Sequence, residues 1–312
     1  MAEFLDLTPK LEQVAYESPR EAATKVMADL ARRENERVGM KLVSSDGRLR
    51  PEMFKREHGG HLSEEELLQC RSFINEREKS WSPLANEQSR AFHIDRYQVS
   101  VHEKSREEID DEILTRWRTE TDFKDTRLVE MAVTACLSRA LGKRWVVAGT
   151  TKYDDYKHGV DQVIVDRTTG QVVAAFDDFA NTASSERKES KYQQVHESAR
   201  KGGAKITFGF SFSVGKLIRR RLQHVPVFAL ETSKSEAVAA LQEMSQTLER
   251  EPGEKERALS KKLITSLVKQ ANTLAKDTSI HPSIRQGAEL FAKSLSEFKR
   301  VEPVERRYAL AA

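Results

Sequence analysis

Residues 159–180, GVDQVIVDRTTGQVVAAFDDFA, constrain the fold most, because two apolar stretches flank a short polar turn. This pattern predicts an antiparallel β-hairpin. The turn ends in glycine, which suits the left-handed position of a three-residue hairpin loop. We therefore expect Thr168, Thr169 and Gly170 to form the loop.

The loop length also predicts the alignment of the two strands. Side chains alternate between the two faces of a sheet, so a shift of one residue would exchange the faces. A loop of two or four residues would place Asp161 opposite Phe176, whereas a loop of three places it opposite Asp177. The expected cross-strand pairs, all on one face, are Arg167–Gln171, Val165–Val173, Val163–Ala175 and Asp161–Asp177.

Two opposed aspartates at the end of apolar strands need an explanation. Like charges directly opposite each other destabilise a sheet, and apolar neighbours add a desolvation cost. A divalent cation would compensate both, because Mg²⁺ binds carboxylates together with water and phosphate oxygens. The sequence therefore suggests that Asp161 and Asp177 are ligands of Mg²⁺ or Mn²⁺. The alternative is that the strand ends are wet and both carboxylates are only solvated.

The segments around the hairpin predict an α/β core. A strongly apolar helix is expected at residues 125–143, a strand at 144–149, and a polar helix at 185–203. A second hairpin is expected over residues 204–231. The predicted order is helix, three strands, helix and two strands.

Both flanks of this core have helical patterns. Residues 18–35 and 63–81 each begin with serine at the cap position, and the second has the glutamate of a capping box. The alternation in residues 97–102 suggests a short strand. The predicted organisation is a mainly helical N-terminal region (1–115), an α/β core (116–232) and a helical C-terminal region (233–312).

Over about a third of its length, the chain resembles the PD-(D/E)xK nuclease superfamily. The resemblance rests on GVDQVIV with Asp161, VVAAFDDF with Asp177 and RLVEMAV with Glu130. KYDDYKHGVD, KITFGF and HVPVFAL also resemble uncharacterised bacterial members. The resemblance to this superfamily implies a restriction-endonuclease-like mixed sheet and metal-dependent cleavage of phosphodiester bonds in DNA or RNA. It also implies that Asp161, Asp177 and Glu130 belong to the active site, with the two aspartates as metal ligands.

The chain departs from the superfamily at the catalytic lysine. Two residues after Asp177 stands Phe179, and taking Asp178 as the acid does not restore a lysine. Some members carry this lysine on the following helix, where Lys191 is the best substitute and Lys188 the second. A lysine there would orient or deprotonate the attacking water. If neither lysine reaches the site, the chain is instead an inactive nuclease-fold module that binds nucleic acid or protein.

A basic stretch follows the acidic hairpin. Six acidic residues lie between positions 154 and 178, whereas none lies between 200 and 224. A negative pocket for metal beside positive charge for the phosphate backbone suits a nuclease. The alternative is a solvated cluster that protects a strand edge. The candidate nucleic-acid-binding residues are Arg200, Lys201, Lys205, Lys216, Arg219, Arg220 and Arg221.

Composition narrows the remaining possibilities. The net charge is only +3, so an electrostatic partner has to be recognised locally. Two cysteines give no disulfide framework, and no apolar run approaches the ~18 residues of a membrane span. We expect a cytoplasmic protein with no membrane partner. Its helical flanks could form a homodimer or dock a protein partner.

Overall fold

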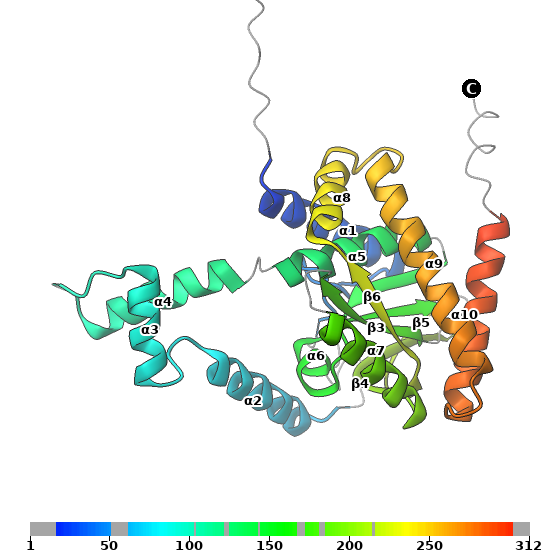
Figure 1. The fold of residues 1–312 in the computed structure, drawn as a ribbon, viewed down its shortest axis with the longest axis horizontal. Coiled ribbons are helices and arrows are strands. Elements are labelled where there is room, and N and C mark those ends of the chain that lie inside the picture. The colour runs from blue at the N-terminus through cyan, green and yellow to red at the C-terminus, as the bar shows by residue number, and fades with distance from the viewer. Residues whose placement is uncertain are drawn as a thin grey trace, which may run out of the picture.

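The computed structural model places a mixed β-sheet at the centre of the body, with helices packed around it (Figure 1). The fold class is mixed α/β, as the sequence predicts. The residues that the structure describes are 17–50, 62–102, 104–121, 125–142, 144–166, 172–180, 185–213 and 216–301.

The central sheet has four strands in the order β1-β2-β3-β6. The first three are antiparallel, whereas β6 runs parallel to β3. β1 and β2 are buried at every position, which explains why their sequences are almost continuously apolar. The strands are β1 (Trp145–Gly149), β2 (Gln162–Asp166), β3 (Val172–Ala180) and β6 (Val227–Thr232).

The observed alignment of β2 with β3 agrees with the prediction at Val163, which pairs with Ala175. A bulge then shifts the ladder, so that Val165 pairs with Val172 and not with Val173 as predicted. The prediction was wrong at this pair because an extra residue of β3 enters the ladder. The predicted loop and the Arg167–Gln171 pair lie outside the described residues.

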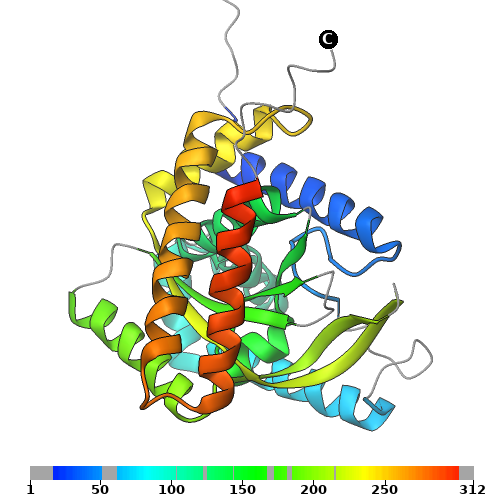
Figure 2. The ribbon, with the colours of Figure 1, turned by 90° about the vertical axis from the view of Figure 1, so that its right-hand side faces the viewer.

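Helices from both flanks share one hydrophobic core with the sheet. α5 (Asp125–Leu141) packs against β1 and β3, while α1 (Pro19–Val38) packs against α5 and α8. The three C-terminal helices are α8 (Lys234–Gln246), α9 (Glu254–Lys276) and α10 (Pro282–Val301). Figure 2 shows α9 and α10 side by side across the sheet. The core therefore continues through all three regions expected from the sequence.

α2 (Glu64–Trp81), α3 (Glu87–Tyr97) and α4 (Arg106–Thr121) extend away from the body as an arm (Figure 1). Both predicted serine caps form, at the starts of α1 and α2, and the capping box predicted for α2 is present in α1 as well. The strand suggested at residues 97–102 is wrong. Tyr97 ends α3 and Gln98 caps it in the left-handed conformation, because the apolar alternation there serves a small core between α3 and α4.

The second hairpin consists of β4 (Ala204–Ser213) and β5 (Lys216–Val225), which form a separate two-stranded sheet (Figure 2). Residues 216–231 were expected to form one strand, but Pro226 separates β5 from β6. Proline lacks the N–H that a continuous ladder requires, and β6 joins the central sheet instead. The sequence also gave no sign of α6 (Lys152–His158), which is too short to show a helical period.

None of the described helices combines the length and apolar character needed to cross a membrane.

Candidate active site

Asp161 lies immediately before β2 and is held against β3. Its backbone N–H donates to the carbonyl of Phe176 at 2.9 Å. Its carboxylate Oδ2 accepts a hydrogen bond of 2.8 Å from the backbone N–H of Asp178. Because Gln162 pairs with Phe176, extending the observed register by one residue brings Asp161 alongside Asp177. The backbone of β3 therefore positions the first candidate ligand.

Asp177 is in direct contact with Lys191 of α7 (Ser185–Arg200). The Lys191 Nζ lies 2.8 Å from Asp177 Oδ1 and 2.6 Å from Oδ2, so that it donates to both oxygens. The two side chains are 30% and 16% exposed, respectively, so the pair is only partly screened by water. The structure thus brings a lysine of the following helix to the acidic end of β3.

Two further contacts fix the rotation of α7 over this edge of the sheet. Lys188 Nζ lies 2.8 Å from Glu231 of β6, and the ring of Tyr192 meets that of Phe179 edge to face. Phe179 and Glu231 are partners in the parallel β3–β6 ladder. Lys188 is therefore bound to Glu231, while Lys191 is the lysine that reaches Asp177, one of the two predicted aspartates.

Asp178 points to the opposite face from Asp177, because successive residues of a strand alternate. It is 8% exposed, and its Oδ2 accepts a hydrogen bond from Gln162 Nε2. The same Gln162 nitrogen donates to the carbonyl of Glu130 at 2.8 Å. Asp178 Oδ1 is buried without a hydrogen-bond partner among the described residues. Sequence reasoning missed Gln162, whose only signal is a polar residue within an apolar strand.

Glu130 is bound by two arginines. Arg127 Nη1 lies 2.9 Å from its carboxylate, and Arg48 Nη2 lies at 3.5 Å. Arg48 also donates to Asp155 at 2.9 Å through its other terminal nitrogen. Arg48 precedes Glu130 by 82 positions, so no local pattern could have placed it in the site. The carboxylate of Glu130 is thus already neutralised by cationic side chains.

The site has an excess of buried negative charge. Burial raises the pKa of Asp161 well above its ordinary value, and the nearby charges of Glu130, Asp155 and Asp177 raise it further. Burial also raises the pKa of Asp178, with additional repulsion from the surrounding carboxylates. Lys191 and the arginines therefore only partly compensate the negative charge. A further cation would favour the ionised forms.

The candidate basic residues spread over three elements, α7, β4 and β5, and the loop that joins the first two. Arg200 ends α7, Lys205 is the second residue of β4, and both are exposed. Lys201 lies between them and pairs with Glu197 at 3.0 Å. Arg221 of β5 pairs with Glu66 of the arm. Three more lie on β5: Lys216 opposite Ser213, Arg219 opposite Phe210, and Arg220 opposite Gly209.

The side chains of the site include several carboxylates that could bind a metal ion. Among the described residues, no three His, Cys, Asp or Glu side chains are grouped so that they could hold a metal ion. The Lys191 ammonium group occupies both oxygens of Asp177. Nevertheless, Asp161 lies alongside Asp177 in the strand register, and the raised pKa of Asp161 suits a neighbouring hard cation. Carboxylates suitable for Mg²⁺ are thus present, although Asp177 is engaged.

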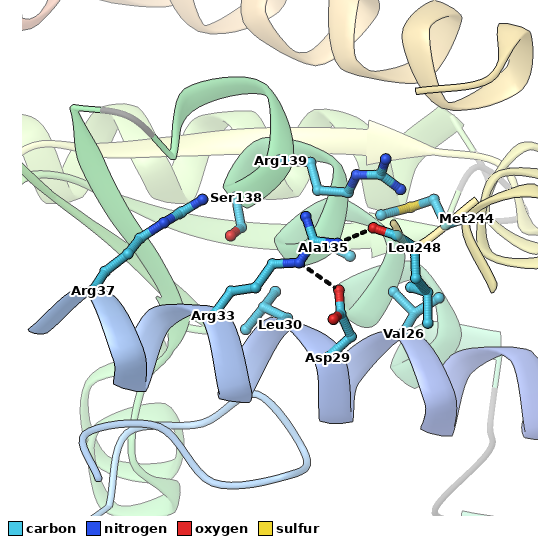
Figure 3. A pocket seen from close by; sticks show the side chains of 10 residues that line it. All are labelled: Val26, Asp29, Leu30, Arg33, Arg37, Ala135, Ser138, Arg139, Met244 and Leu248. Atoms are coloured by element: carbon cyan, nitrogen blue, oxygen red, sulfur yellow. Dashed lines mark hydrogen bonds and ion pairs between the residues drawn. The ribbon is translucent and has the colours of Figure 1, made fainter. Parts of the chain in front are cut away.

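A small cavity between α1, α5 and α8 lies apart from these carboxylates and is too small to be a second candidate site (Figure 3). Its volume is about 10 Å³, which is space for about one water molecule. Arg33 at its wall is held by Asp29 at 2.7 Å and by the carbonyl of Leu248. Its charged groups are therefore part of the packing between helices.

Comparisons with known proteins identify no relative of this chain. No family model, no curated protein and no solved structure matches the chain. The side chains of the site are therefore the basis for a functional proposal.

Proposed function

We propose that this chain is a metal-dependent nuclease that hydrolyses phosphodiester bonds in DNA or RNA. The contact between Lys191 and Asp177 carries the proposal, because it joins a cationic side chain to a group of carboxylates with excess negative charge. Burial and the repulsion of neighbouring carboxylates raise the pKa of two of these groups, Asp161 and Asp178. Such perturbed acids are typical of functional sites.

Asp161 and Asp177 would hold Mg²⁺ or Mn²⁺. When bound, the metal would lower the pKa of the attacking water and neutralise charge on the phosphate. Lys191, whose ammonium group contacts Asp177, would orient that water by donating a hydrogen bond to it. Gln162 holds Asp178 in place, and Arg48 holds the carboxylates of Glu130 and Asp155 apart from the reaction.

The order of elements also supports the proposal. α5, three antiparallel strands, α7 and the parallel strand β6 follow one another as the PD-(D/E)xK resemblance implies. α6 and the β4–β5 hairpin are additions to that order. A restriction-endonuclease-like core is therefore part of the proposal.

A second candidate function is an inactive nuclease-fold module that binds nucleic acid without cleaving it. The observation that favours it is the same ion pair, since Lys191 occupies the carboxylate oxygens that a metal would need. Arg48 and Arg127 do the same at Glu130. In this alternative, the cationic side chains replace the metal permanently.

A cleavage assay separates the two candidates. Labelled single- and double-stranded DNA and RNA are incubated with the protein in Mg²⁺, in Mn²⁺ and in EDTA. The nuclease proposal expects metal-dependent cleavage, which Asp161→Asn abolishes and Lys191→Ala reduces by about 100-fold or more. Lys262→Ala is the matched control, because Lys262 forms an exposed pair with Glu236. Binding without cleavage in any metal would instead support the inactive module, and neither binding nor cleavage would refute both.

A further inference from the structure

Tyr192 stands out among the exposed large apolar side chains. Its exposed fraction is 42%, and it lies on α7, next to Lys191. Within the described part of the chain, it is the one member of this set on an element that carries a candidate catalytic side chain. The set consists of Leu68, Trp81, Phe92, Val101, Tyr192 and Leu290.

The position of the Tyr192 ring is well defined. Its centroid lies 5.8 Å from that of Phe179, with the two planes at 87°. On the same helix, Lys191 is bound to Asp177 and Lys188 to Glu231. Three separate contacts thus restrain α7, so the helix as well as the side-chain rotamer fixes the position of the partly exposed ring. A rigid aromatic side chain of this kind is preorganised for binding.

The spacing of residues along β3 relates the Tyr192 ring, through its contact with Phe179, to Asp177. Phe179 follows Asp177 by two residues, so both side chains point to the same face of β3. Two residues of a strand rise by about 6.6 Å, which is comparable to the spacing of adjacent nucleotides in an extended strand. A phosphate at Asp177 would therefore place a neighbouring base near Tyr192.

We propose that Tyr192 stacks on an unpaired base beside the scissile phosphate, and that the substrate is single-stranded nucleic acid or a single-stranded end. This inference rests on the proposed function. Every base offers a π face, and stacking on an aromatic side chain contributes about 1–3 kcal/mol per base. A base within a duplex is stacked on both faces, so an exposed tyrosine can reach only an unpaired or terminal one. Tyr192 is thus a positioning residue that selects substrate structure rather than sequence.

The test measures binding without cleavage. Fluorescence anisotropy in EDTA compares a short single strand, its blunt duplex, and single strands with an abasic position moved along the sequence. Wild type is compared with Tyr192→Leu, which keeps an apolar contact with Phe179, and with Tyr192→Phe, which keeps the ring. We expect Tyr192→Leu to weaken single-strand binding by about 5- to 100-fold. Tyr192→Phe and duplex binding should change little.

The abasic series separates stacking from a structural role. One abasic position should weaken binding to wild type but not to Tyr192→Leu, since the missing base and the missing ring belong to one contact. Equal affinity of wild type and Tyr192→Leu, or equal abasic profiles, would overturn the stacking proposal while leaving nuclease activity intact. If Tyr192→Leu fails to fold, the affinities of the wild type for the abasic series test the proposal alone. Equal affinity at every abasic position would contradict stacking. No binding of any nucleic acid, either in EDTA or with Mg²⁺ present, would refute the proposed function as well.

Discussion

Asp178→Asn should make the protein more stable at neutral pH, although it removes a candidate active-site acid. Asp178 is buried, and one carboxylate oxygen has no hydrogen-bond partner among the described residues. Burial and the neighbouring carboxylates raise its pKa well above the ordinary value. Asparagine has nearly the same shape, can still accept from Gln162 with its amide oxygen, and carries no charge.

The expected magnitude follows from the group that is removed. A buried polar atom left without a partner costs about 1–3 kcal/mol, and a charged one costs more. An unpaired amide in the same place costs less than an unpaired charge. We therefore expect Asp178→Asn to increase the free energy of unfolding by about 1–3 kcal/mol at pH 8.

The gain should depend on pH in a defined direction. Because the pKa of Asp178 is higher in the folded than in the unfolded state, its contribution to stability is fully present below the unfolded pKa. That contribution is lost as pH rises through the folded pKa. The wild type is thus penalised at pH 8 but much less at pH 4, where the carboxyl is protonated. The advantage of Asp178→Asn should shrink accordingly.

Urea denaturation in EDTA at pH 8 and pH 4, followed by circular dichroism, measures this difference. Asp166→Asn is the matched control, because Asp166 is also buried but accepts a hydrogen bond of 3.0 Å from Arg144. This substitution should lower the free energy of unfolding. A loss of stability in Asp178→Asn at pH 8, or an equal gain at both pH values, would refute the reasoning.

Two further predictions concern other buried charges. Asp154 accepts backbone hydrogen bonds from Thr207 at 2.7 Å and Phe208 at 3.0 Å. Asp154→Ala should therefore cost about 1–3 kcal/mol for each freed amide, and hydrogen exchange should accelerate at those two residues of β4 while the amides of β2 keep their protection. Arg48 bridges two carboxylates with a side chain that is 13% exposed, so Arg48→Ala should destabilise the protein by about 3–5 kcal/mol in urea denaturation. A loss below about 1 kcal/mol would mean that water screens the bridge.

The sequence by itself determined the features that depend on near neighbours. Strand alternation aligned Val163 with Ala175, and the serine caps at the starts of α1 and α2 were correctly predicted. The superfamily resemblance also directed attention to the helix after β3, where Lys191 contacts Asp177. These features involve residues only a few positions apart, or strands joined by one short turn, so periodicity and capping chemistry are sufficient to predict them.

Only the tertiary structure decided which distant groups share the site. Arg48 reaches Glu130 from a different part of the chain, and Gln162 joins Asp178 to the backbone of α5. The separation of β5 from β6 at Pro226 likewise depends on which sheet each strand can join. Buried charges and polar groups are stable only when they are paired, and their partners are chosen by packing in three dimensions. No pattern along the chain records that choice.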